Sequence, residues 1–133
     1  LQNLFDMGKP VDYANIKFST SQVIDLKVGD GAVLTKKSKF VFHHRSWVYD
    51  PSLEDFKGKS LGESYSRPEA ITSTFGDGTL MPRWEKMIEG MKVGGIKRLI
   101  LTPKSLDQKQ KLLFMFPRDH WVMQDIELLE IKQ

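Results

Sequence analysis

The chain has 133 residues, a formal net charge of +3 and no cysteine. This length suits one domain with a single hydrophobic core. The absence of cysteine excludes disulfides, thiolate metal sites and cysteine nucleophiles. No apolar run is long enough to span a bilayer, so no transmembrane segment is expected. The lysines gather in two polar stretches, residues 36–39 and 104–111, which indicates solvated loops, and no nucleic acid is expected as a partner.

The first part of the chain differs from the rest in its pattern. Residues 1–20 show no hydrophobic periodicity, and we expect them to form an N-terminal extension or a partner-binding arm. Residues 21–133 are expected to form the folded domain. The chain opens without a methionine or a signal-peptide layout, so we expect any targeting sequence to have been removed.

Two strands are predicted next. The stretch SQVIDLKVGDG, which begins at Ser21, indicates a strand ended by a Gly-Asp-Gly turn at residues 29–31, where we expect the glycines to supply positive φ angles. The stretch KKSKFVFHHRSWVYD at residues 36–50 alternates over a greater length. Its alternation places Phe40, Phe42, His44 and Ser46 on one face.

A polar segment follows this second strand. Residues 50–70 carry two prolines and two glycines and predict a long loop broken by short extended pieces. Loops of this length in small domains are usually functional or mobile. The stretch AITSTFGDG then predicts a further short strand that turns at residues 76–78.

One short helix is predicted after this turn. Pro82 suits the first helical position, and Trp84, Met87, Ile88 and Met91 recur at the spacing of one apolar stripe. The glycines that follow end the helix early. The stretches IKRLILTP and QDIELLEIK predict the last two strands. About five antiparallel strands with one short helix across a curved sheet make an α+β domain.

Several motifs occur together in a recognisable order. Leu80-Met81 precede Arg83-Trp84-Glu85, and these are followed by GMKVG at residues 90–94, RLILTP at 98–103 and Ile126-Glu127-Leu128. In order and spacing the chain, over roughly residues 21–133, resembles the FKBP-type peptidyl-prolyl isomerases. The resemblance implies a bent antiparallel β-sheet wrapped around one short α-helix. It also implies prolyl isomerase (rotamase) activity on X-Pro bonds in proteins, without a cofactor.

The resemblance further implies an apolar substrate pocket. Its floor is Trp84, which would lie under the proline ring. The backbone N–H of Met81, next to Leu80, would bind a substrate carbonyl. Leu61 and Ile71 stand at two wall positions that are aromatic in the family, and Arg67 stands at a loop position that is often basic there.

Other pocket positions depart from the family pattern. His44 replaces a tyrosine, Gly62 an aspartate, Asp107 a tyrosine and Gln124 a phenylalanine. Two of these changes bring polarity into a site that works by being dry, and a buried, poorly paired polar group costs about 1–3 kcal/mol. The segment Phe114, Met115 and Phe116 could refill part of the pocket. We therefore expect a degenerate site with weak activity.

Rival site types are less favoured by the sequence. Adjacent strand residues such as His43 and His44 point to opposite faces, so they cannot share a metal ion, and no metal is expected. The turn at residues 76–78 lacks the lysine and hydroxyl residue of a phosphate-binding loop.

Two functions remain open. The chain is either an isomerase that acts on proline-containing polypeptides, or an inactive FKBP-like scaffold, an accessory subunit of a larger complex. The long segment 50–70 and the arm 1–20 favour the scaffold. The lack of cysteine agrees with an imported organelle protein, such as one of the chloroplast thylakoid lumen, where the resemblance places divergent relatives.

Overall fold

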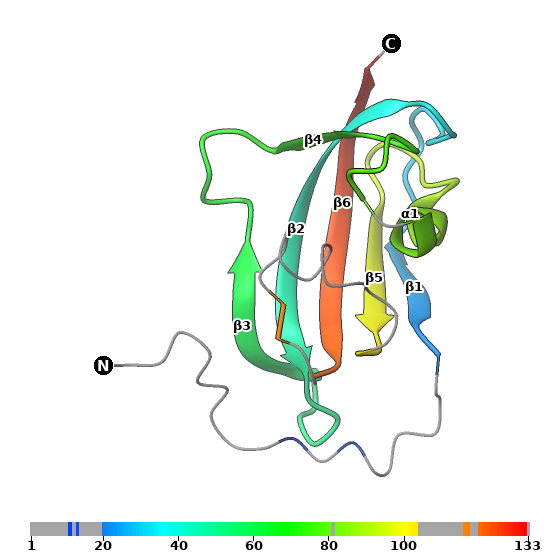
Figure 1. The fold of residues 1–133 in the computed structure, drawn as a ribbon. Coiled ribbons are helices and arrows are strands. Elements are labelled where there is room, and N and C mark those ends of the chain that lie inside the picture. Colours follow the sequence, from blue (N-terminus) through cyan, green and yellow to red (C-terminus); the bar gives the residue numbers. More distant parts are fainter. Residues whose placement is uncertain are drawn as a thin grey trace.

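The computed structural model describes residues 11, 13, 20–80, 82–103, 116–117 and 120–132. In this part of the chain, one short helix lies on one face of a six-stranded antiparallel sheet (Figure 1). In chain order the elements are β1 (Gln22–Lys27), β2 (Lys39–Tyr49), β3 (Lys57–Glu63), β4 (Ile71–Thr74), α1 (Pro82–Ile88), β5 (Ile96–Leu101) and β6 (Val122–Lys132). The predicted α+β class and the single helix are confirmed.

The long strand β2 organises the sheet. The strand order is β1-β5-β6-β2-β3, and β4 also pairs with β2. One edge of β2 pairs with β6, and the other is shared by β4, from Lys39 to Phe42, and β3, from Arg45 to Tyr49. A register shift against β6 between Val41 and Phe42 marks a bulge, and bulges bend and twist a strand. Figure 1 shows β2 curving at this end of the sheet.

Residues 50–70, predicted as a long loop broken by short extended pieces, contain the strand β3, whose length was not predicted. Seven of these residues, Lys57–Glu63, form a strand that pairs with β2 through two register shifts. The strand lies at the edge of the sheet and its side chains are exposed or only half-buried. An edge strand of this kind needs no alternation of apolar residues, so the sequence carried no periodic signal for it.

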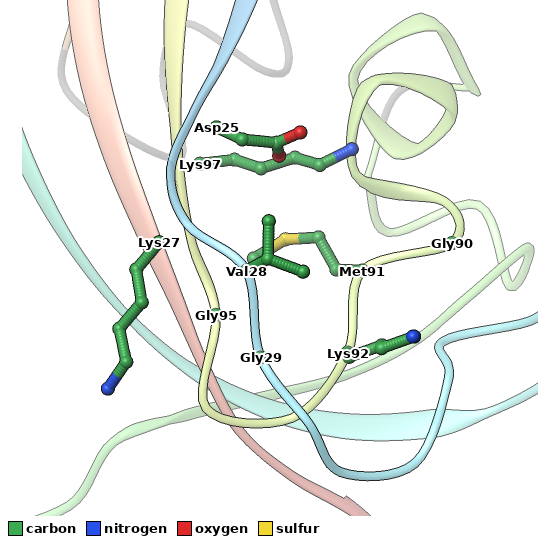
Figure 2. A pocket seen from close by; sticks show the side chains of 9 residues that line it. All are labelled: Asp25, Lys27, Val28, Gly29, Gly90, Met91, Lys92, Gly95 and Lys97. Carbon is green, nitrogen blue, oxygen red and sulfur yellow. The ribbon is translucent and has the colours of Figure 1, made fainter.

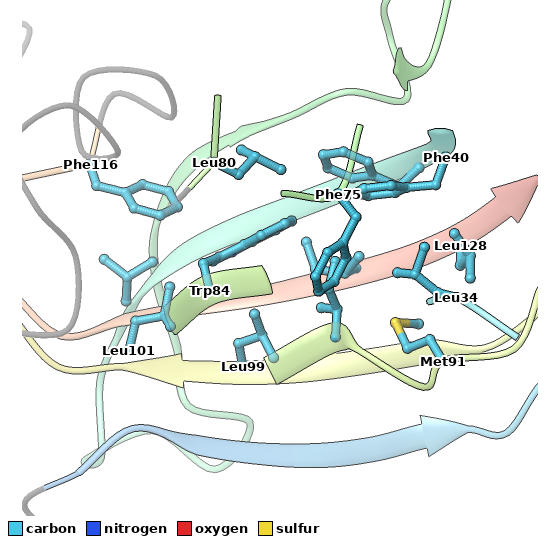
Figure 3. Packing of buried hydrophobic residues seen from close by; sticks show 14 residues of the cluster. Leu34, Phe40, Phe75, Leu80, Trp84, Met91, Leu99, Leu101, Phe116 and Leu128 are labelled. Carbon is cyan, nitrogen blue, oxygen red and sulfur yellow. The ribbon is translucent and has the colours of Figure 1, made fainter. Parts of the chain in front are cut away.

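The main core lies between α1 and the sheet, as Figure 3 shows. Phe40 and Phe42 of β2 are fully buried on the predicted face, and Trp84 and Ile88 of α1 pack against them. Strands β5 and β6, together with flanking segments, complete this core with Leu34, Phe75, Leu80, Met91, Leu99, Leu101, Phe116, Val122, Ile126 and Leu128. The alternation of β2 and the stripe on the helix therefore predicted the core correctly.

A second, smaller cluster lies on the opposite face of the sheet. Tyr49, Ile100 and Met123 are buried there, and Trp47 and Trp121 pack against them. Tyr13, one of the few described residues before position 20, joins this cluster, and its ring stacks on Trp121 with a centroid separation of 5.9 Å. No helix in the described ranges is long and apolar enough to cross a membrane.

The turn after β1 needs its first glycine because of a close backbone contact, and not because of the predicted positive φ angle. Positive φ angles occur at Gly76 and Gly78 but not at Gly29 or Gly31. Instead, a Cβ atom on Gly29 would collide with the carbonyl oxygens of Lys92 and Val93. Glycine is needed at this position because two backbone segments touch, so the expectation of positive φ at residues 29–31 was wrong.

Candidate functional site

A cavity of about 170 Å³ opens beside the main core, between β2, β4 and the segment that leads into α1. It is large enough for several waters, each of which occupies about 30 Å³, and thus for a small ring. The residues that line it are Phe42, His44, Arg67, Ile71, Thr72, Ser73, Thr79 and Leu80. The cavity therefore brings together three predicted pocket residues, His44, Ile71 and Leu80, with the predicted basic residue Arg67.

Trp84 lies one layer deeper than this cavity. Its side chain is 0% exposed, and it is not among the lining residues. Phe42 connects the two, since it lines the cavity and its ring lies 5.7 Å from the indole, centroid to centroid, at an angle of 49°. The indole Nε1–H donates a hydrogen bond to Oε1 of Gln124 at 2.8 Å. The tryptophan thus supports the cavity from below.

The other predicted positions lie around this arrangement or outside the described residues. Phe116 is buried in the same cluster as Leu80 and Trp84 (Figure 3). Leu61 is half-buried against the core and does not line the cavity. Gly62 has a φ of +127°, and nothing lies within 4 Å of the position a Cβ would take. Four of the predicted positions lie outside the described ranges: Met81, Asp107, Phe114 and Met115.

His44 lines the cavity with an imidazole that is uncharged at neutral pH. The side chain is only 5% exposed, and its Nδ1 lies 3.1 Å from the hydroxyl of Ser46. The pKa of His44 is lowered from 6.5 to about 4, chiefly by burial and then by the positive charge of Arg67, while Glu63 acts in the opposite direction. At neutral pH the imidazole is therefore uncharged and contributes hydrogen-bonding capacity without charge.

Three hydroxyl residues of the cavity, Thr72, Ser73 and Thr79, were not predicted as site residues. One of them had a signal in the sequence. Ser73 stands between Ile71 and Phe75 on the inward-facing register of β4, so a polar side chain was due to point at the core. It is 8% exposed, and its Oγ has no hydrogen-bond partner among the described residues.

A second cavity, of about 120 Å³, lies between β1 and the segment after α1. Figure 2 shows its lining, in which Lys27 and Lys92 extend away from each other while Lys97 extends toward the helix. The Lys97 ammonium lies 3.4 Å from the carbonyl oxygen of Met87. Because these cations diverge, they do not form a common binding site.

No group of three or more metal-binding side chains was found in the described ranges. His43 and His44 lie on opposite faces of β2. His43 bonds the Ser64 hydroxyl at 2.9 Å, and His44 lines the cavity. The two imidazoles therefore do not converge on one point.

The chain is similar to known proteins over most of its length. The family model of FKBP-type peptidyl-prolyl cis-trans isomerases matches residues 35–129. The chain is 32% identical over 111 residues to the peptidyl-prolyl cis-trans isomerase FKBP16-4, chloroplastic, of Arabidopsis thaliana, a match that covers 82% of this chain and 47% of that protein. It is 30% identical over 97 residues to FKBP19, chloroplastic, of the same plant, covering 70% and 38%. The chain thus spans half or less of the length of these curated relatives.

Solved structures agree on the fold. The crystal structure of AtFKBP13 superimposes with a TM-score of 0.63 at 20% identity, covering 84% of this chain and 93% of that one. FkpA from Escherichia coli gives a TM-score of 0.62 at 20% identity, covering 84% and 48%. At this level of identity the likeness establishes the fold alone, and it confirms the bent sheet around one short helix.

Proposed function

Since this chain belongs to the FKBP-type peptidyl-prolyl cis-trans isomerase family, we propose that residues 21–133 bind X-Pro segments of polypeptides and isomerise them weakly. The substrate site is the 170 Å³ cavity. The observation that carries this proposal is its apolar wall, in which Phe42, Ile71 and Leu80 meet beside the buried indole of Trp84.

The chemistry needs little more than such a wall. The barrier to rotation about the peptide bond is about 18–20 kcal/mol and comes from amide resonance. A twisted amide has lost this resonance and is less dipolar than a planar one, so a dry, apolar site favours the transition state over the ground state. No acid, base or nucleophile takes part. The cavity offers the proline ring the side chains of Phe42, Ile71 and Leu80 and offers the amide few charges.

Two features support weak rather than strong catalysis. The indole of Trp84 is covered and presents no open face to a substrate. The cavity lining also includes an imidazole, a guanidinium and three hydroxyls. These groups make the site more polar, which stabilises the planar amide and lowers the differential binding of the twisted one. We expect acceleration that is measurable but small for this family.

Two measurements together test this proposal. The first follows the isomerisation of a short X-Pro-Phe peptide with the protein and in buffer alone. The second maps peptide binding by amide chemical shifts, which should change at Ile71, Thr72 and Thr79 and stay constant at Lys27 and Lys92 of the second cavity. A rate equal to that in buffer, with no shifts at the first cavity, would contradict the proposal.

A scaffold role is the second candidate, and the edge strand β1 favours it. Among the described strands, β1 lies at one end of the sheet and pairs with β5 alone. The strand and the residue after it expose apolar side chains, as strands that meet a partner do. These side chains belong to Val23, Ile24, Leu26 and Val28. In this role the family fold would serve as a subunit of a larger complex, with residues 1–20 as a partner-binding arm.

The two candidates are separable by experiment. A scaffold co-purifies with a stable complex, loses it when Ile24 and Leu26 are both changed to serine, and keeps it when Ile71 is changed to serine. An isomerase loses peptide turnover when Ile71 is changed to serine and keeps it when Ile24 and Leu26 are both changed to serine. We also propose a plastid location, which the names of both Arabidopsis relatives support, and cell fractionation tests it.

A further inference from the structure

We infer that the 170 Å³ cavity selects proline-containing segments that carry an acidic side chain next to the proline. This inference rests on the proposed function, because it concerns which peptide the same site accepts. It is carried by the charge and the hydrogen-bond donors of the cavity, which are arranged around Arg67, Ser73 and Thr79.

The cavity has a cation and no anion. Arg67 lines it, and among the residues that the structure describes no aspartate or glutamate does. Within the described part of the chain, Arg67 has no ion-pair partner, whereas Arg98 pairs with Asp125 at 2.8 Å. Position 62, where the family pattern has an aspartate, is a glycine. A guanidinium without a carboxylate partner at a cavity wall is suited to bind one from a ligand.

Two carboxylates lie near Arg67 in sequence, those of Glu69 and Glu63. Neither forms an ion pair with it in the described part of the chain, and Glu63 is engaged elsewhere. Glu63 Oε2 accepts the backbone N–H of Ser66 at 2.9 Å. These contacts with Ser66, together with the charge of Arg45, lower the pKa of Glu63. Arg67 is not among the groups that shift it. The charge of Arg67 is instead felt by His44 across the cavity, where it lowers the pKa of a side chain that is already neutral. The described lining residues therefore carry one positive charge.

The hydroxyls supply the second observation. Ser73 is 8% exposed, and its Oγ lacks a hydrogen-bond partner among the described residues. A buried hydroxyl without a partner is rare in proteins, and each such group calls for an explanation. With Thr72 and Thr79 beside it in the lining, it forms a set of donors that a carboxylate can accept from.

The backbone of the loop that carries Arg67 is fixed to the sheet, whereas the Arg67 side chain is exposed. The Arg67 N–H donates to the carbonyl of Ser64 at 3.1 Å, and the Ser64 hydroxyl accepts the backbone N–H of His44 at 2.8 Å. Tyr65 stacks on His43 with ring centroids 4.3 Å apart, and its hydroxyl donates to Glu127 at 2.7 Å. A fixed loop backbone lowers the entropy that is lost when Arg67 binds a partner.

The test compares isosteric peptides that differ in one charge. Isomerisation rates and binding are measured for Ala-Glu-Pro-Phe against Ala-Gln-Pro-Phe, and for Ala-Pro-Glu-Phe against Ala-Pro-Gln-Phe. We expect a preference of up to about fivefold for glutamate on one side of the proline, typical of one ion pair with an exposed arginine. The preference should be smaller at high salt, because salt screens exposed charges.

Four variants assign the preference. Arg67→Gln should remove it, and Arg67→Lys should retain part of it. Arg83→Gln, which removes an exposed arginine of α1 outside the cavity, should leave it unchanged. Ser73→Ala removes a hydroxyl with no described partner, so the fold should persist while the glutamate preference falls severalfold.

The outcomes separate this inference from the proposed function. Equal turnover of glutamate and glutamine peptides on both sides of the proline would overturn the inference and leave the isomerase proposal standing. A preference that survives Arg67→Gln would also overturn it. If no peptide is bound or isomerised, both proposals fall together.

Discussion

The indole N–H of Trp84 donates a hydrogen bond to the side-chain oxygen of Gln124 at 2.8 Å, in the middle of the core. Both side chains are 0% exposed. The bond joins the helix to the central strand β6 and occupies the polar edge of the tryptophan. The Nε2 of Gln124 has no hydrogen-bond partner among the described residues. The pair therefore satisfies the indole N–H and leaves the amide nitrogen of Gln124 unsatisfied.

The coupling of this pair is the first prediction. Gln124→Leu leaves the indole N–H without this acceptor, and Trp84→Phe leaves the amide oxygen without this donor, so each single variant is destabilised by about 1–3 kcal/mol from this cause alone. The double variant avoids both unmet groups. Chemical denaturation of all four proteins should therefore give a coupling energy of about 1 kcal/mol or more, and additive losses would contradict it.

His44 should make the fold sensitive to acid. Its folded pKa of about 4 lies below the ordinary value of 6.5, so the unfolded chain binds a proton more readily. The corresponding stability is complete above pH 6.5, declines as the pH falls, and is lost below about pH 4. It amounts to on the order of 3 kcal/mol. His44→Phe should flatten this part of the pH–stability curve, measured by denaturation between pH 4 and 7.

The groups around His44 set the expected size of that effect. Arg67 and His43 lower its pKa and Glu63 raises it, but burial is the largest cause. Arg67→Gln should therefore shift the curve only slightly. A wild-type protein whose stability is unchanged from pH 7 to pH 4, apart from its carboxylates, would contradict the buried neutral imidazole.

The polarity of the cavity should limit catalysis. His44→Phe replaces the neutral imidazole in the cavity lining with an apolar ring, which favours the less dipolar, twisted amide. We expect isomerisation of a neutral peptide such as Ala-Leu-Pro-Phe to become severalfold faster. The matched control is His43→Phe on the opposite face of β2, which keeps the stacking on Tyr65 and should leave the rate unchanged. A slower His44→Phe enzyme would show that the imidazole helps catalysis.

Gly29 should tolerate no side chain. A methyl group there collides with the carbonyl oxygens of Lys92 and Val93, and relief requires that backbone moves. Gly29→Ala should lower the free energy of unfolding by about 3 kcal/mol, at the upper end for overpacking. The control is Val28→Ala, next to it and 73% exposed, which should change stability by less than about 0.5 kcal/mol. Thermal or urea denaturation measures both.

Part of this architecture could be predicted because local patterns report burial. The alternation of Phe40 and Phe42 and the spacing of Trp84 and Ile88 predicted the two sides of the core. Strand β3 was missed because an edge strand buries little and therefore carries no apolar period. The motif order identified the family, and with it the positions of His44 and Ile71 at the cavity.

The depth of the site could not be read from the sequence. Whether Trp84 faces a substrate or lies beneath another ring depends on Phe42 and Gln124, which approach it from different strands. Long-range packing of this kind has no signature in local spacing. Ser73 was also missed, although its place between Ile71 and Phe75, which alternate with it, was a usable signal.

The most direct measurement compares two serine variants in peptide isomerisation. Ile71 lines the cavity, whereas Val41, equally half-buried on the neighbouring strand, does not. The isomerisation of an Ala-Leu-Pro-Phe peptide is followed by NMR exchange, and we expect the wild-type protein to exceed the spontaneous rate. Val41→Ser should be as fast as the wild-type protein. Ile71→Ser should catalyse the reaction about tenfold more slowly, because it loses apolar contact with the proline ring. A wild-type rate equal to that in buffer, or equal rates for the two variants, would contradict the assignment of this cavity as the substrate site.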